Sequence, residues 1–151
     1  IINLKLKNSI IIRTSWLYSR YGNNFVKKII SLAKNKSEIN VVNDQEGSPT
    51  NAFDLADSIL KILNRLDFKE TKVFHFSNLD GCTWYDFAAK ICKISRLEVK
   101  LNPISSCSLN LKANRPQFSV LDQSLFYKQF GIKIIKWDIS LTKFLKNYHE
   151  R

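Results

Sequence analysis

Residues Ile10–Phe25 read IIIRTSWLYSRYGNNF, and this stretch predicts a buried strand, a turn and the start of a helix. Its first three residues form a short apolar run that fits a strand covered on both faces. Polar residues and Trp16 follow at once, and Gly22 marks a loop before a helical apolar pattern begins. Open α/β sheets place ligands where a strand ends in this way. The stretch therefore indicates a ligand site, with a plain core role for Trp16 as the alternative.

The composition is that of one globular domain with its own core. The chain has 151 residues, 44% of them hydrophobic and 25% charged. No apolar run reaches the length of about 18 residues that a membrane span needs, so we expect no membrane partner. The lysine-interrupted N-terminus does not resemble a signal peptide. Because the chain has no Met at its start or elsewhere, we expect it to be a fragment of a longer protein.

The net charge of +11 raises nucleic-acid binding as a hypothesis. The lysines, however, are scattered over the outer sides of the predicted helices, with no interleaved aromatic residues and no zinc-finger or RNA-binding motif. We therefore expect no nucleic-acid partner, and a basic nucleic-acid-binding module remains a minor alternative. A site for an anionic small molecule would use only a few of these charges.

Cysteines and histidines point to no metal or nucleophilic chemistry. Cys82, Cys92 and Cys107 have no C-x-x-C spacing, which indicates buried free thiols in a reducing cytoplasm. His75 and His149 are too few and too isolated for a metal site. No Ser-His-Asp set or carboxylate pair stands out, so we expect no metal and no catalytic residue in this chain.

Alternating strand and helix patterns predict an α/β fold with parallel pairing of the early strands. The expected strands cover residues 10–14, 39–42, 72–77 and 98–101, and residues 105–115 are expected to form a loop. Five helices are expected, and each begins after a residue whose side chain can cap it: Asn23 or Asn24, Asn51, Thr83, Asp122 and Asp138. The fourth helix is expected to end at Gly131. The second is expected to turn six apolar residues inward: Leu55, Ala56, Ile59, Leu60, Leu63 and Leu66.

Two motifs of dinucleotide-dependent reductases are missing from the sequence. The four glycines stand far apart, so they cannot form a glycine-rich phosphate-binding loop. No Tyr-x-x-x-Lys occurs, and Tyr85 and Lys90 would lie about 140° apart around a helix. These residues therefore predict a binding architecture without its own catalytic apparatus.

Four blocks of the sequence, in order, resemble the motifs of the dTDP-4-dehydrorhamnose reductase family. They read RTSWLY with YGNNFV, VNDQEGSPT with DLA, FHFSN with TWYDFA, and NRP with SVLD and FGI. The blocks lie within residues 10–147, which is almost the whole chain. The resemblance implies the C-terminal part of a Rossmann-like NAD(P)-binding fold with its smaller substrate-binding domain. Residues 1–151 would form the substrate-binding portion, with the N-terminal cofactor-binding portion absent.

The resemblance also implies a reaction, the conversion of dTDP-4-dehydro-L-rhamnose to dTDP-L-rhamnose for cell-surface polysaccharide. NADPH or NADH, bound mainly by the absent portion, would supply the hydride, and that portion would carry the Tyr-x-x-x-Lys pair. The chain alone is then expected to be inactive. The resemblance implies a dTDP-sugar as its partner and the cytoplasm as its location. It is also compatible with a homo-oligomer. The alternative is a non-catalytic regulatory or scaffold member of the same superfamily.

The resemblance assigns the substrate site to residues at the end of the first strand. The family's sugar-contacting Trp corresponds to Trp16, and Thr14 and Ser15 stand where the strand end passes the nicotinamide and the sugar. An indole offers an apolar face to a deoxysugar ring and an N–H donor to its oxygens. We therefore expect Trp16 to form one wall of the sugar pocket.

Four further residues are expected to line the groove for the nucleotide diphosphate: Asn24, Phe25, Gln45 and Arg115. For Arg115 the reason is physical, because a planar bidentate donor suits a diphosphate. Its alternative is a solvated loop arginine. The alternatives for Asn24 and Gln45 are a helix cap and a plain loop residue.

Overall fold

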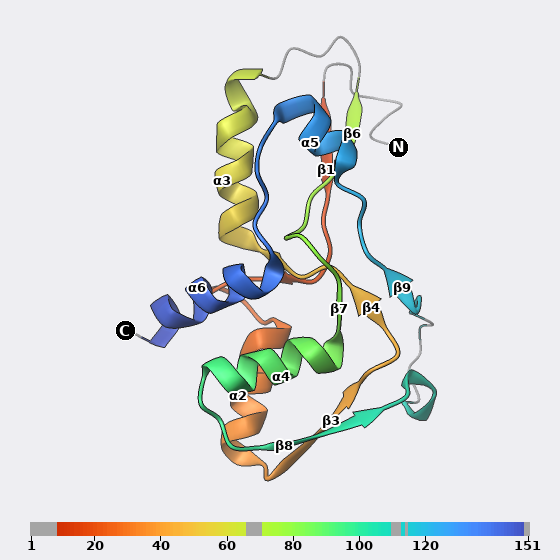
Figure 1. The fold of residues 1–151 in the computed structure, drawn as a ribbon, viewed down its shortest axis with the longest axis vertical. Helices are drawn as coiled ribbons and strands as arrows, with labels where there is room; N and C mark the ends of the chain where they lie inside the picture. Colours follow the sequence, from red (N-terminus) through yellow and green to blue (C-terminus); the bar gives the residue numbers. More distant parts are fainter. Residues whose placement is uncertain (1–8, 66–70, 110–112, 114, 150–151) are drawn as a thin grey trace.

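The computed structural model describes residues 9–65, 71–109, 113 and 115–149. Its strands are β1 (Ile10–Arg13), β2 (Leu17–Tyr18), β3 (Glu38–Val42), β4 (Glu46–Gly47), β5 (Thr50–Asn51), β6 (Lys72–His75), β7 (Cys82–Thr83), β8 (Lys100–Ile104) and β9 (Phe118–Ser119). Its α-helices are α2 (Phe25–Asn35), α3 (Ala52–Ile62), α4 (Trp84–Ile94), α5 (Ser124–Phe130) and α6 (Trp137–His149). Two 3₁₀ turns cover Leu63–Arg65 and Ser106–Ser108. The expected α/β fold is confirmed (Figure 1).

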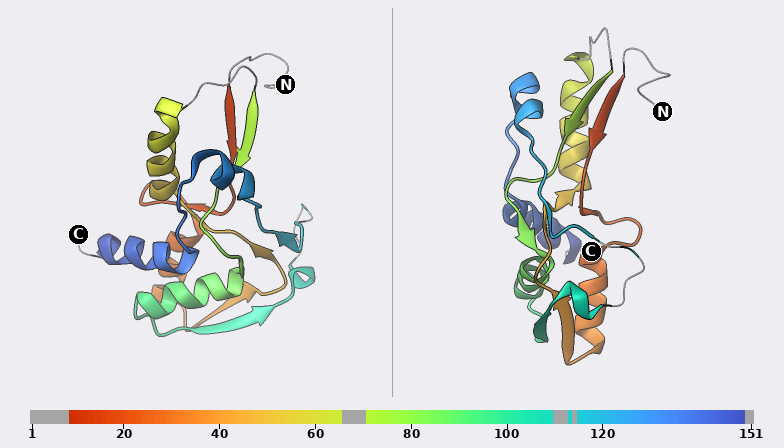
Figure 2. Two further views of the ribbon diagram at one scale, coloured as in Figure 1. Left: turned by 45° about the horizontal axis from the view of Figure 1, so that its top comes forward. Right: turned by 90° about the vertical axis from the view of Figure 1, so that its right-hand side faces the viewer.

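The first strand lies in a two-stranded parallel sheet with β6, in which Ile12 is the partner of Phe74. Helices α3 and α5 lie on the same side of these strands (Figure 2). The buried residues between them form what we call the sheet core: Ile62, Phe74, Phe76, Phe126 and Phe130.

The expectation that β1 is buried on both faces does not hold for the described residues. Ile10 and Ile12 pack against the sheet core, whereas Ile11 and its partner Val73 belong to neither buried cluster. All three isoleucines are only half-buried. One face of the sheet is therefore left without a packed layer by the described part of the chain.

A second and larger cluster lies at the opposite end of the molecule, around α2, α4 and α6 (Figure 1). We call it the helical core, and its buried members are Tyr18, Val26, Ile29, Ile30, Ile39, Val41, Cys82, Phe87, Ala88, Ile91, Cys92, Leu141 and Leu145. The parallel pair of β3 and β8 runs along it, and β7–β4–β9 form a small mixed sheet beside it.

Local capping signals located most helix starts correctly. The side chain of Asn24 accepts a hydrogen bond from Lys27 N, and that of Asn51 accepts one from Phe53 N. Thr83 forms a complete capping box at the start of α4. Gly131 ends α5 with φ of 66°, the left-handed conformation that glycine adopts without strain.

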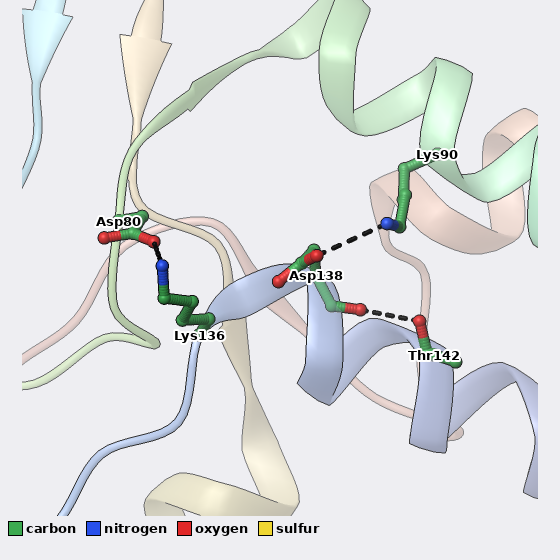
Figure 3. Close-up of polar contacts among 5 residues, drawn as sticks. All are labelled: Asp80, Lys90, Lys136, Asp138 and Thr142. Carbon is green, nitrogen blue, oxygen red and sulfur yellow. Dashed lines mark hydrogen bonds and ion pairs between the residues drawn. The ribbon is translucent and has the colours of Figure 1, made fainter.

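Two expected caps are wrong by one or two residues. Helix α5 begins at Ser124, and Asp122 accepts hydrogen bonds from Ser124 without being the cap residue itself. Helix α6 begins at Trp137, before Asp138. Figure 3 shows that the Asp138 carboxylate instead pairs with Lys90 of α4, with Nζ and Oδ2 3.3 Å apart.

The same close-up shows a second surface ion pair, between Lys136 and Asp80 at 3.1 Å, which ties the start of α6 to the β6–β7 loop. The Thr142 hydroxyl donates to the Asp138 carbonyl one turn back in α6. Because both ion pairs are partly or largely exposed, each contributes little to stability.

The inward face of α3 also differs from the expected one. Ile62 is fully buried, whereas Leu60 and Leu63 are 67% and 50% exposed. Leu66 lies outside the described residues. Leu55 packs against the sheet core as expected, but the buried residues of α3 are Ser58 and Ile62, so the observed inward stripe passes through a serine that apolar periodicity leaves out. Packing against the sheet decides between the two stripes.

The three thiols are free, as expected, but Cys107 is exposed and lies in a 3₁₀ turn rather than a plain loop. Burial raises the pKa of the Cys82 and Cys92 thiols. No helix in the described part of the chain is long and apolar enough to cross a membrane.

Candidate functional site

The turn after β1 is bound closely to the β4–β5 segment. The Thr14 hydroxyl donates to the Thr50 hydroxyl at 3.0 Å, and the Ser15 hydroxyl donates to the Ser48 carbonyl at 2.7 Å. The Thr50 amide donates to the Trp16 carbonyl at 3.2 Å. These bonds join two of the family-like blocks at the carboxyl end of β1, where α/β sheets bind ligands.

Trp16 lies half-buried in a cluster of aromatic rings. Its indole stacks on that of Trp84, with ring centroids 3.4 Å apart and planes within 9°. Phe25 packs on the same Trp84 ring at 4.5 Å. Thus the structure brings Trp16 and Phe25 together through Trp84, and Phe25 serves as a packing residue of this cluster.

The Asn24 side chain caps the N-terminus of α2. Its Oδ1 accepts from Lys27 N at 3.2 Å, and its Nδ2 donates to the Ser19 carbonyl at 2.7 Å. The capping alternative therefore describes its observed contacts.

Gln45 and Arg115 differ sharply in exposure. Gln45 is only 6% exposed and immediately precedes β4, whereas Arg115 is exposed. The Gln117 carbonyl, two residues after Arg115, accepts a hydrogen bond from Glu46 N at 2.7 Å. Gln45 thus directly precedes β4, and the exposed Arg115 lies three residues before β9, the parallel neighbour of β4.

A hollow of about 450 Å³ opens beside this region, within the range of small-molecule sites. Its lining includes Ser48, Leu121 and Gln123. The Ser48 hydroxyl accepts from the Leu121 amide at 3.2 Å, while its carbonyl holds Ser15. The hollow therefore adjoins the turn that carries the predicted site.

A buried polar network joins the two ends of the molecule, and sequence reasoning missed it. Asn78 accepts from Asn51 N at 2.8 Å and donates to Asp54 at 2.7 Å. The Ser140 hydroxyl donates to Asp54, and the Tyr18 hydroxyl donates to Ser140 at 3.5 Å. Burial raises the pKa of Tyr18, so its phenol stays protonated near neutral pH. The partners lie up to 122 residues apart, beyond the reach of any local pattern.

Sequence reasoning also missed Trp84 and Gly47 as neighbours of Trp16. Trp84 stands in the block TWYDFA and Gly47 in the block VNDQEGSPT, and neither block indicates a contact with Trp16. A β-carbon at Gly47 would lie only 2.4 Å from the Trp16 ring. The glycine at position 47 is visible in the sequence, but the Trp16 ring that leaves no room for a β-carbon there is not.

The described residues do not fit a dinucleotide cofactor's phosphates. Glycine-rich turns at helix starts form such sites, whereas Asn24, Asn51, Thr83 and Gln123 precede the four helices whose starts are defined by a cap residue. No group of three or more His, Cys, Asp or Glu that could hold a metal occurs within the described ranges. The arrangement places two hydroxyl groups and an indole together at the end of β1.

Comparison with solved structures shows which class of protein shares this fold. The chain has the fold of dTDP-4-dehydrorhamnose reductases: it is similar to that enzyme from Bacillus anthracis in complex with NADP, with a TM-score of 0.81 and 37% identity, covering 91% of this chain and 48% of the other. A lower-identity likeness to dTDP-glucose 4,6-dehydratase from the same organism, at 12% identity and a TM-score of 0.71, extends the shared Rossmann-like fold to dehydratases.

The family follows from the sequence match. The model of the RmlD substrate binding domain matches residues 1–150, so the chain belongs to that family. It is 37% identical over 146 residues to the spore coat polysaccharide biosynthesis protein SpsK of Bacillus subtilis, covering 97% of this chain and 50% of that protein. The chain therefore spans about half the length of the curated relatives it matches.

Proposed function

We propose that this chain is the substrate-binding portion of an NAD(P)H-dependent reductase that converts dTDP-4-dehydro-L-rhamnose to dTDP-L-rhamnose. The observation that carries the proposal is the match of the substrate-binding family model to nearly the whole chain. The NADP complex of the Bacillus anthracis relative supports NADP as the cofactor of the whole enzyme. Three free thiols agree with a cytoplasmic location.

In this proposal the chain's residues bind and orient the substrate, and none of them is catalytic. Trp16 offers its indole face and N–H to the sugar, next to the hydroxyls of Thr14 and Ser15 at the strand end. Gln45 precedes β4 and the exposed Arg115 precedes its neighbour β9, and Arg115 supplies a bidentate donor for the diphosphate. Asn24 caps α2 and Phe25 packs on Trp84, and both stand beside this site as further candidates for contact with the nucleotide diphosphate.

The test is NADPH oxidation with dTDP-4-dehydro-L-rhamnose added. The 151-residue chain alone is expected to show no turnover, and the same chain joined behind the cofactor-binding half of the Bacillus anthracis reductase is expected to show it. Turnover by the chain alone would contradict the division of roles. A folded hybrid that binds NADPH but neither binds nor reduces the sugar nucleotide would contradict the substrate assignment and favour a non-catalytic member of the superfamily.

A further inference from the structure

Trp16 has a backbone conformation that residues with a β-carbon rarely adopt. Its φ is 44°, in the left-handed region, where a bulky side chain is strained. Such a conformation persists only when its surroundings hold it. The hydrogen bonds of Ser15 to Ser48 and of Thr50 to Trp16 hold the backbone on both sides of the indole.

The indole itself is held by Trp84. The two rings lie nearly parallel at 3.4 Å, and Phe25 packs at 4.5 Å on Trp84. Trp84 is the first residue of α4, where Thr83 and Asp86 form a capping box with bonds of 3.0 and 3.1 Å to backbone amides. Trp84 is therefore anchored independently of Trp16.

Gly47 provides the space for this stack. A β-carbon there would lie 2.4 Å from Cε2 of the Trp16 indole and 2.6 Å from Cζ2 and Nε1, so the ring would have to move. Gly47 cannot retreat easily, because it pairs with Cys82 of β7 on one side and Ser119 of β9 on the other.

We propose that Gly47 and Trp84 are positioning residues that fix the Trp16 indole for the sugar. This inference rests on the proposed function, in which Trp16 contacts the deoxysugar. It predicts that disturbing either neighbour weakens binding of the sugar nucleotide by about as much as losing Trp16, roughly tenfold or more. Binding of dTDP, which lacks the sugar, should change little.

The experiment compares Gly47→Ala with the matched control Gly81→Ala in the full chain. A β-carbon at Gly81 would crowd Glu46 Oε1 and Val120 Cγ2, each at 2.7 Å, and not Trp16. The first readout is the exciton couplet that stacked indoles give in circular dichroism, since Gly47→Ala keeps all three tryptophans. The second is the Kd for dTDP-L-rhamnose and for dTDP. We expect Gly47→Ala, and not Gly81→Ala, to lose the couplet and to weaken only dTDP-L-rhamnose binding.

A retained couplet in Gly47→Ala, or a lost couplet with unchanged dTDP-L-rhamnose binding, would overturn the inference. If Gly47→Ala does not fold, Trp84→Ala and Trp84→Phe decide: the first should match Trp16→Ala in Kd, the second should recover most of the affinity, and the double variant Trp16→Ala/Trp84→Ala should be no worse than Trp16→Ala alone. Additive losses would contradict positioning. If the unaltered chain binds dTDP-L-rhamnose no better than dTDP, the sugar contact of the proposed function fails, while the couplet still reports whether Gly47 holds the indole.

Discussion

The helical core and the sheet core differ in how far the described residues enclose their buried side chains. The helical core packs α2, α4 and α6 around Phe87, which is fully buried and has aromatic neighbours on several sides. The sheet core covers one face of a two-stranded sheet and leaves Ile11 and Val73 outside it. A two-stranded parallel sheet is normally part of a larger, doubly covered one. The comparison teaches that the described residues enclose Phe87 on several sides, whereas they cover only one face of the β1–β6 sheet.

The largest expected effect compares two fully buried phenylalanines. Phe87→Ala should cost about 3–5 kcal/mol of unfolding free energy, because its ring is enclosed by other rings that cannot close the cavity. Phe126→Ala should fall at the lower end of that range, since the sheet beneath it is covered on one face only by the described residues and can move toward the cavity. Denaturant unfolding measures both. Phe118→Ala, at a 66% exposed position, serves as the control and should change little. An equal or larger cost at Phe126 would contradict the comparison.

A smaller effect is expected at the polar network that connects the two regions. Asn78→Ala should cost about 1–3 kcal/mol, because it leaves the buried backbone N–H of Asn51 without its acceptor and removes a hydrogen bond to Asp54, which keeps the one from Ser140. The surface substitution Asn102→Ala, which removes bonds to Glu38 and Asn40, is its control. The two variants are compared by thermal unfolding. Similar melting temperatures for both would show that the network contributes nothing beyond a surface contact.

The smallest expected effect is a loss of stability in acid. Hydrogen bonds from Ser105 and Ser106 lower the pKa of Asp44 below its ordinary 3.8, and those from Ser124 lower the pKa of Asp122. A lowered folded pKa means that the unfolded state binds the proton more tightly. The stabilisation is therefore fully present above about pH 3.8, and it is lost as the pH falls through the lowered pKa of the folded state.

Unfolding of the unaltered chain and of Asp44→Ala should be compared from neutral pH to well below pH 3.8. The difference in stability between them should shrink toward low pH. A difference that stays constant over this range would show that the Asp44 carboxylate does not act through its charge.

The predictable part of the fold was local, and the part that could not be predicted depends on distant contacts. Asn24, Asn51 and Thr83 cap helices through amides two or three residues away, so their patterns are visible in sequence. The inward face of α3 depends instead on which stripe meets the sheet. The whole of α2 and α3 and several strands separate Trp16 from Trp84 along the chain, and no periodicity links the two residues.

The predicted site residues divide in the same way. Thr14, Ser15 and Trp16 lie together because they are consecutive, and the structure adds their bonds to the β4–β5 segment. Asn24 makes the contacts of its capping alternative. The ligand contacts of all seven residues remain predictions.

The most direct test of the account is a titration of the isotope-labelled chain with dTDP-L-rhamnose, followed by NMR. We predict saturable shifts at the Trp16 indole N–H and at the amides of Thr14, Ser15 and the residues of β4, with little change at the C-terminal end of α3. The absence of saturable shifts, or shifts confined to helices away from the turn after β1, would contradict the claim that this chain carries the sugar-nucleotide site.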